Sequence, residues 1–321
     1  MISPDDVHRA RETIGDRLHR TPTLTSRTLS ERVGAGTLLK AELFQKTGSF
    51  KPRGVLNRIA ELTPDERAAG VVTWSAGNAA QAVAYAAALE GLDCRVFMWR
   101  SANPLKVAAT RAYGATADLE AGGVAEAHER LLEHTRVTGA TFVHPFDDPA
   151  LQAGHGTIGL EILEDVPDVD VVICPVGGGG LISGLATAVK GLRPACRVVG
   201  VEPEGSTALS SALAAGQIVQ VAPRTIADGL GAPFTGENAL EVCRERVDSV
   251  VLVSEAEIEA GMRFLYRRAK LACEPAGAAA TAALLAGKIE LDPGETAVAV
   301  VSGGNAAPEV VAAILARPDE G

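Results

Sequence analysis

The sequence predicts an α/β protein built from mostly parallel sheets. Short apolar runs rich in Val and Ile alternate with Ala- and Leu-rich stretches of helical length along most of the 321 residues. Glycine-containing turns directly follow several of these runs, which is typical of ligand-binding loops at the carboxyl ends of parallel strands. We therefore expect open, twisted sheets with helices on both faces.

The expected elements fall into two groups. The first group has strands at 71–74, 94–98 and 141–144 and helices at 79–89, 104–113 and 124–138. The second has strands at 169–175, 198–201, 250–253 and 297–301 and helices at 181–191, 255–271 and from 277 onward. This grouping predicts a large domain made of residues 1–69 and 148–321, with a small domain, residues 70–147, inserted between its two parts.

Charge and composition limit the possible partners. With 40 acidic and 30 basic residues the net charge is −10, which argues against nucleic acid or an anionic membrane as a partner. No apolar run approaches the roughly 20 residues of a membrane span, and the first 20 residues lack the apolar core of a signal peptide. Five scattered cysteines without Cys-x-x-Cys spacing indicate free thiols. We expect a cytoplasmic protein with a small-molecule ligand.

Lys51 lies in an unusual setting. Most lysines are solvated surface residues, but Gly48, Ser49 and Phe50 precede this one and Pro52 follows it. Such a turn suits neither a surface helix nor a strand. A lysine that forms an imine needs a partly desolvated site, where its amine can be neutral and nucleophilic, and an aromatic neighbour suits the edge of a planar cofactor. The turn therefore favours an imine-forming lysine.

Four consecutive glycines, Gly177–Gly180, follow a predicted buried strand and precede a predicted helix. Glycines let successive N–H groups converge on an anion without interference from a Cβ atom. The dinucleotide pattern Gly-x-Gly-x-x-Gly fails because Ile182 and Ser183 stand where its last glycine is needed, and the P-loop pattern fails because Leu185 replaces its lysine. A phosphate site is favoured over a flexible turn.

Another polar turn, Ser75-Ala76-Gly77-Asn78, follows the strand expected at 71–74, with Gln81 about one helical turn later. Its backbone amides and the Ser75 hydroxyl could bind a carboxylate at a helix N-terminus. Asn78 could donate to a phenolate-type oxygen. An ordinary N-cap is an equal alternative.

The turn Ser302-Gly303-Gly304-Asn305 ends the last predicted strand. A hydroxyl facing a pyridine nitrogen cannot hold that nitrogen protonated, so the ring is a weaker electron sink, which favours elimination over transamination or racemisation. Glu274 could approach the same region. An imine-forming lysine, a phosphate loop and a turn that can cap a heterocycle together indicate pyridoxal 5′-phosphate.

In this order and spacing, the three loops resemble those of the serine/threonine dehydratase family of fold-type II enzymes, and the resemblance covers nearly the whole chain. Further segments fit the family, namely Thr21-Pro22, Pro104 with Lys106, residues 145–149, residues 227–229 and Glu274-Pro275. The resemblance implies the fold of the tryptophan synthase β subunit, with two open, twisted, mostly parallel sheets. We also expect a homodimer or homotetramer.

The resemblance also implies roles for individual residues. Lys51 would bind pyridoxal phosphate as an imine, with Phe50 beside the ring and Asn78 at its 3′-oxygen. Gly177, Gly178, Gly179 and Gly180 would hold the phosphate, Ser302 would face the pyridine nitrogen, and Glu274 would lie near the cofactor. The substrate side would be formed by Ser75, Ala76, Gly77, Ala79 and Gln81.

Several positions depart from the family pattern. Ala76 replaces the serine that racemases use as a second acid–base group, and a methyl group cannot move a proton. Ala79 replaces a common histidine, which predicts a roomier, more apolar pocket and a β-substituent larger than that of serine. Trp74 and Trp99-Arg100 are also unusual. In metal-dependent members a carboxylate pair binds a cation, but here Glu202 is retained while Ala208 replaces the second acid, so we expect no metal.

The resemblance implies a pyridoxal phosphate-dependent ammonia-lyase that converts a β-hydroxy-α-amino acid to a 2-oxo acid and ammonia. Threonine, serine and a bulkier analogue such as phenylserine are the candidate substrates. The alternatives are serine racemase, a non-catalytic amino-acid-binding regulatory protein, and a β-replacement enzyme of the cysteine synthase type. That last type typically has Asn-x-x-Gly-Ser-x-Lys-Asp-Arg, whereas Phe50 precedes and Pro52 follows the lysine here. With only a short tail after residue 305, feedback control through an additional regulatory domain is not expected.

Overall fold

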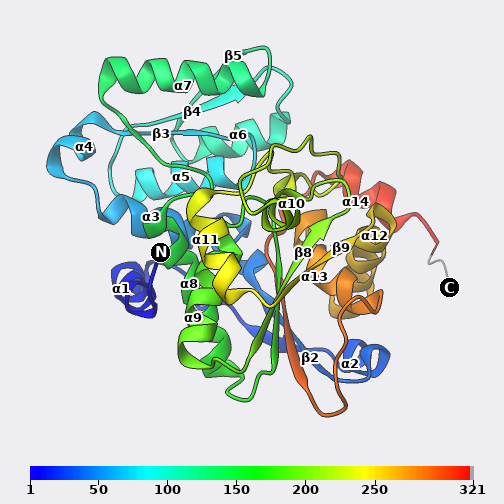
Figure 1. Ribbon diagram of the computed structural model, residues 1–321. Helices are drawn as coiled ribbons and strands as arrows, with labels where there is room; N and C mark the ends of the chain where they lie inside the picture. Colours follow the sequence, from blue (N-terminus) through cyan, green and yellow to red (C-terminus); the bar gives the residue numbers. More distant parts are fainter. Residues whose placement is uncertain (319–321) are drawn as a thin grey trace.

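The strands form two separate sheets in the computed structural model, which describes residues 1–318 (Figure 1). The large sheet has the order β1-β2-β10-β7-β8-β9, and only β1 runs antiparallel to its neighbour. Its strands are β1 (Thr23–Thr25), β2 (Gly36–Ala41), β7 (Val171–Pro175), β8 (Arg197–Pro203), β9 (Ser249–Val253) and β10 (Thr296–Val301). The predicted α/β class with mostly parallel sheets is confirmed.

The small sheet is entirely parallel, with the order β5-β4-β3-β6. Its strands are β3 (Val71–Trp74), β4 (Cys94–Trp99), β5 (Thr116–Ala121) and β6 (Thr141–Phe142). The sequence analysis missed β5, whose residues Thr-Ala-Asp-Leu-Glu-Ala form a partly exposed edge strand without an apolar run. All strands of this sheet come from residues 71–142, but the division into domains at 69/70 and 147/148 remains a prediction.

Helices cover both faces of both sheets (Figure 1). Those around the small sheet are α5 (Asn78–Leu89), α6 (Pro104–Ala112) and α7 (Val124–Thr138), and α4 (Pro64–Ala69) precedes β3. The remaining helices are α1 (Pro4–Ile14), α2 (Arg27–Val33), α3 (Lys51–Ala60), α8 (Pro149–Asp165), α9 (Gly180–Leu192), α10 (Ala208–Ala215), α11 (Glu237–Arg246), α12 (Glu255–Phe264), α13 (Pro275–Leu285) and α14 (Pro308–Leu315). Short 3₁₀ turns lie at Gly15–Arg17, Glu42–Phe44, Lys46–Gly48 and Asp228–Leu230.

One predicted helix needs correction, and several helices, α8 among them, were not predicted. The helix expected at 255–271 ends as an α-helix at Phe264, and a π-turn, Leu265–Ala269, follows before Lys270 reverses the chain with φ of 60°. Helix α8 was not predicted, because glycines at 154, 156 and 159 disfavour an isolated helix. In the fold these glycines allow α8 to pack closely against its neighbours.

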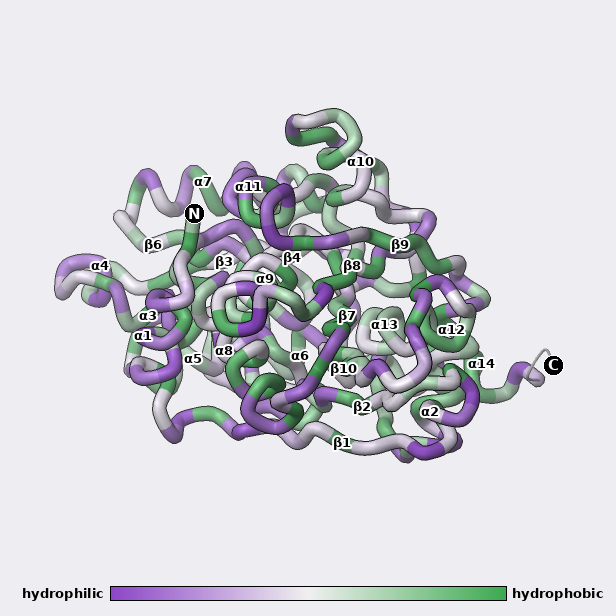
Figure 2. Tube along the Cα trace, turned by 60° about the horizontal axis from the view of Figure 1, so that its bottom comes forward, coloured by the Kyte–Doolittle hydropathy of each residue, from purple (hydrophilic) through white to green (hydrophobic). Residues whose placement is uncertain are grey.

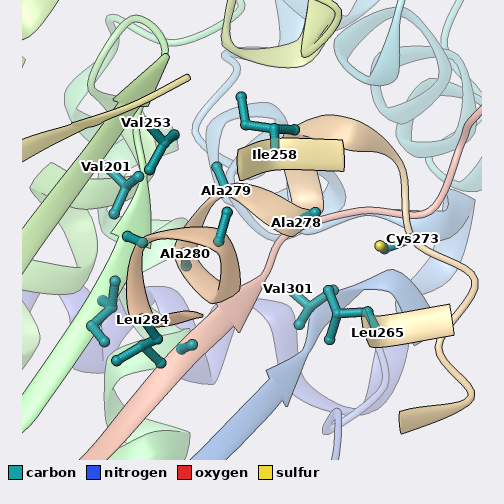
Figure 3. Packing of buried hydrophobic residues seen from close by; sticks show 14 of the residues in the cluster. Val201, Val253, Ile258, Leu265, Cys273, Ala278, Ala279, Ala280, Leu284 and Val301 are labelled. Carbon is teal, nitrogen blue, oxygen red and sulfur yellow. The ribbon is translucent and has the colours of Figure 1, made fainter. Parts of the chain in front are cut away.

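The core lies on both faces of the large sheet. Along β10, Ala297, Ala299 and Val301 pack with α12 and α13, whereas Val298 and Val300 face α8 and α9. Figure 3 shows the first of these layers, where the alanines of α13 let that helix lie close to Val201, Val253 and Ile258.

Surface helix α7 instead alternates apolar and polar residues (Figure 2). Within residues 1–318 no helix has the length and hydropathy required to cross a membrane.

Helices α3 and α8 approach each other through facing glycines. A Cβ atom at Gly54 would lie 2.4 Å from Cε1 of His155, and one at Gly154 would lie 2.4 Å from the carbonyl oxygen of Arg53. Real Cβ atoms essentially never approach backbone this closely. Glycine at these positions therefore sets the spacing of the helix that begins with Lys51.

Gly154→Ala should lower the free energy of unfolding by roughly 2 kcal/mol or more, because the new methyl group would meet backbone atoms that no side-chain rotation can move. The matched control is Gly123→Ala, since a Cβ atom there meets nothing within 4 Å and φ is −165°. Urea unfolding should show the control within about 1 kcal/mol of the wild type. Equal stability of the two variants would contradict the close α3–α8 contact.

Candidate active site

A cavity of about 540 Å³ lies where loops from both sheets meet. It is lined by nearly all the site residues that the sequence predicts, namely Phe50, Lys51, Ser75, Ala76, Gly77, Asn78, Ala79, Gly177, Gly178, Gly179, Gly180, Glu274 and Ser302. Most of these residues lie in the loops that follow β3, β7 and β10. Phe50, Lys51 and Glu274 lie instead at the starts of helices α3 and α13. Gln81, the remaining predicted residue, is buried on α5 and is not among the lining residues.

Lys51 begins α3, and its side chain reaches into the cavity. The Nζ atom donates a hydrogen bond to the carbonyl oxygen of Pro145 at 2.6 Å and lies 5.0 Å from the centre of the Phe50 ring. Burial lowers the pKa of the Lys51 amine to about 8, although the carboxylate of Glu274 opposes this shift. A larger share of the amine is therefore neutral and nucleophilic at pH 7 to 8 than for an ordinary lysine.

The first turn of α3 is anchored by Arg53, which does not line the cavity. Arg53 is 2% exposed and pairs with Glu42 at 2.8 Å and with Glu161 at 2.6 Å. Lys40 also contacts Glu161, at 2.7 Å. These buried ion pairs join β2, α3 and α8, so the backbone that carries Lys51 is held by three elements.

The glycine loop connects β7 to α9. Within residues 1–318, no protein acceptor is found for the N–H groups of Gly177–Gly180, as expected for a helix N-terminus that borders a cavity. Packing also requires some of these glycines, because a Cβ atom at Gly178 would lie 2.3 Å from the Phe146 ring and one at Gly180 would lie 2.4 Å from the Phe146 carbonyl oxygen. The loop thus has free amide donors, and Phe146 leaves no room for a side chain at Gly178 or Gly180.

Asn78 and Glu274 form a polar pair in the cavity. The Asn78 amide donates to Oε1 of Glu274 at 2.6 Å, while Asn305 donates to Oδ1 of Asn78 at 2.9 Å and to the carbonyl oxygen of Thr47 at 2.7 Å. Burial raises the pKa of Glu274 to about 7, and Asp228 adds to this effect. Oε2 of Glu274 is buried and has no partner among the described residues.

An ion pair crosses the cavity wall. Lys106 on α6 bonds to Asp228 in the turn Asp228–Leu230, and both line the cavity. The sequence analysis quoted both segments, and also Asn305, but assigned none of them to the site. These residues line the cavity only because segments far apart in the sequence meet there, and no local sequence pattern predicts such a meeting.

Glu202 is fully buried and accepts hydrogen bonds from the backbone N–H groups of Leu209, at 2.7 Å, and Ser210, at 2.9 Å. Its carboxylate therefore caps the first turn of α10. Across residues 1–318, no three His, Cys, Asp or Glu side chains are grouped so that they could hold a metal ion.

The lining residues fit pyridoxal phosphate. The free amides of Gly177–Gly180 suit its phosphate, the Lys51 amine suits its aldehyde, and the unpartnered Oε2 of Glu274 and the Ser302 hydroxyl are polar groups in the same cavity. Residues 14–303 match the family described as pyridoxal-phosphate dependent enzyme. The chain belongs to this family, and the predicted cofactor is confirmed.

Individual relatives are similar along most of the chain. The L-threonine ammonia-lyase of Thermotoga maritima is 44% identical over 306 residues, covering 95% of this chain and 76% of the relative. The catabolic L-threonine dehydratase TdcB of Escherichia coli K12 is 42% identical over 306 residues, covering 95% of this chain and 93% of the relative.

Solved structures show the same similarity. The T.th. threonine deaminase has a TM-score of 0.90 and 41% identity, with 95% of this chain and 99% of the other covered. Maize serine racemase has a TM-score of 0.93 and 35% identity, with coverages of 97% and 96%. The predicted resemblance and the fold-type II architecture are confirmed.

The lowered pKa of Lys51 predicts how cofactor binding depends on pH. Only a neutral amine attacks an aldehyde, so recombination of the apoprotein with pyridoxal phosphate should accelerate with pH and level off above about 8. The visible absorbance of the bound cofactor measures the rate. A rate that instead keeps rising toward pH 10, the ordinary range of lysine, would contradict burial of the amine.

Proposed function

We propose that this protein is a pyridoxal phosphate-dependent ammonia-lyase that converts a β-hydroxy-α-amino acid, threonine, serine or a bulkier analogue, to a 2-oxo acid and ammonia. The observation that carries the proposal is the shared cavity of Lys51, Ser302 and the glycine loop. Relatives named threonine ammonia-lyase or threonine dehydratase, 42–44% identical over 95% of this chain, support the substrate class.

In this proposal the cofactor, when bound, supplies an electron sink for the bonds at Cα. The Nζ atom of Lys51 removes the Cα proton. The amides of Gly177–Gly180 would hold the phosphate, and the Ser302 hydroxyl would be the partner of the pyridine nitrogen. The N-terminus of α5, entered through Gly77, binds the substrate carboxylate. The Cα proton and the β-hydroxyl group leave the substrate as one molecule of water. The unsaturated amine that remains takes up water again and gives the 2-oxo acid and ammonia.

The other site residues receive supporting roles. Phe50 would border the cofactor ring and Asn78 would contact its 3′-oxygen, while Glu274 orients Asn78 through the 2.6 Å hydrogen bond. Ser75 accepts a hydrogen bond from the Gly77 N–H at 3.1 Å, which shapes the carboxylate-binding turn.

Serine racemase is a second candidate because solved racemases share the fold. Ala76 disfavours it, since its methyl group lines the cavity and offers no proton.

The proposed partner is a small amino acid, with no nucleic acid or membrane involved, and the net charge of −10 supports the former exclusion. A cytoplasmic location is proposed from the five free cysteines, which suit a reducing compartment. The protein is also proposed to form a homodimer or homotetramer. Exposed apolar side chains such as Phe44 and Leu105 support this, because contact with another copy would cover them.

Lys51→Ala should abolish the absorbance of the covalently bound cofactor and lower kcat by about 10²–10⁴-fold or more, because the proton acceptor is lost. Release of 2-oxo acid from threonine and serine measures the effect. Lys46→Ala is the control, since Lys46 does not line the cavity. Undiminished turnover by Lys51→Ala would overturn the proposed function.

Ala76 predicts dehydration with little racemisation. Chiral chromatography of serine after incubation should show 2-oxo acid forming far faster than the opposite enantiomer, and Ala76→Ser should raise the racemisation rate by placing a hydroxyl in the cavity. Comparable rates of the two reactions in the wild type would favour the racemase alternative.

A further inference from the structure

The chain has two tryptophans, and both line the cavity. Trp74 ends β3 and Trp99 ends β4, the neighbouring strand. Trp74 pairs in register with Phe97, and both tryptophans pack in the apolar cluster that includes Ala127 and Leu131 of α7. Trp99 also packs in the cluster on the α5 side of the sheet. The tryptophans therefore flank the cavity from adjacent strands.

The Trp74 indole is fixed by its neighbours. Its Nε1–H donates to the carbonyl oxygen of Val124 at 3.1 Å, and its ring centre lies 4.7 Å from that of His128. The one hydrogen-bond donor of this indole is therefore occupied. Val124 also lines the cavity and is 45% exposed, so apolar surface continues beyond the tryptophans.

Charged groups of the cavity are already engaged. The cationic side chains among the described lining residues are Lys51, which bonds to Pro145, and Lys106, which pairs with Asp228. Glu274 accepts a hydrogen bond from Asn78. A substrate side chain that carries a carboxylate would therefore find no unpaired cation among these residues.

Ala79 lines the same cavity from the start of α5. It is 5% exposed. Its methyl group adds no polar atom. The combination of two indoles with a small residue suits a flat, uncharged group, since aromatic pairs stack or meet edge to face.

We propose that Trp74, Trp99 and Ala79 make this cavity select β-hydroxy-α-amino acids with an aryl β-substituent over those with hydrogen or methyl. The inference rests on the proposed function and names its substrate class. An aryl group buries more apolar area than a methyl group, which corresponds to a preference of about tenfold or more.

Binding of non-reacting analogues tests the pocket independently of turnover. Holoenzyme is titrated with L-phenylalanine and with L-2-aminobutyrate, which lack a β-hydroxyl group and cannot lose water. Tryptophan fluorescence of the wild type, whose two tryptophans both line the cavity, reports binding. The dissociation constant for phenylalanine should be about tenfold lower. Equal constants would overturn the inference.

Variants locate the preference. Trp99→Leu and the milder Trp99→Phe should each reduce the phenylalanine preference, the former to about threefold or less. Ala79→His should weaken phenylalanine binding while sparing 2-aminobutyrate. Tyr266→Leu, a 42% exposed aromatic residue that does not line the cavity, is the control and should keep the wild-type ratio. Cofactor absorbance replaces fluorescence where tryptophan is removed. Unchanged ratios in all three cavity variants would overturn the assignment.

Turnover separates this inference from the function on which it depends. The kcat/KM for phenylserine should exceed that for threonine by about tenfold, and that for 3-hydroxyaspartate should be lowest. If threonine is consumed but phenylserine is not, the aryl preference fails and the lyase function stands. If no β-hydroxy amino acid yields a 2-oxo acid while phenylalanine still binds preferentially, the lyase function fails and the aryl-binding pocket stands.

Discussion

The position of the reactive lysine depends on the buried ion pairs of Arg53. Its guanidinium contacts Glu42 and Glu161 from two other elements, and all three side chains are at most 10% exposed. Such pairs add little net stability because both partners lose hydration, but removal of one leaves an uncompensated buried charge. The pairs therefore favour one placement of α3 between β2 and α8. Because Lys51 lies two residues before Arg53 in the same helical turn, the ion pairs also determine where the Lys51 side chain enters the cavity.

A second set of contacts joins the lysine turn to the loop after β10. The Phe50 N–H donates to the Ser302 carbonyl oxygen at 3.1 Å, and the Gly304 N–H donates to that of Gly48 at 2.9 Å. Asn305 adds the bond to Thr47, whose φ of 60° is in the left-handed region. Segments about 250 residues apart thus form one unit, and the backbone that carries Lys51 is held against the loop that begins at Ser302. Neither segment could form this arrangement alone.

The sequence predicted what periodicity and local chemistry encode. Buried strands such as β7 and β10 appear as apolar runs, and the loops after them carry the predicted site residues. Strand β5 and helix α8 lack such signals, because an edge strand needs no apolar run and a glycine-rich helix is stabilised only by close neighbours. The glycine loop was explained by anion binding alone, whereas Phe146 gives Gly178 and Gly180 a separate packing reason. Contacts such as Lys106–Asp228 required the fold.

The two sheets contribute different parts of the site. Lys51, the glycine loop and Ser302 belong to segments around the large sheet, while Trp74, Ala79 and Trp99 belong to β3, α5 and β4 around the small sheet. The ion pairs of Arg53 and the backbone bonds to the loop after β10, which place Lys51, do not involve Trp74, Ala79 or Trp99. Some contacts join the two sides, namely the Asn78–Glu274, Asn78–Asn305 and Lys106–Asp228 bonds and the apolar packing of α3 against α5. Substitutions at the small-sheet positions can thus change the shape of the substrate pocket while the ion pairs and backbone bonds that place Lys51 remain intact.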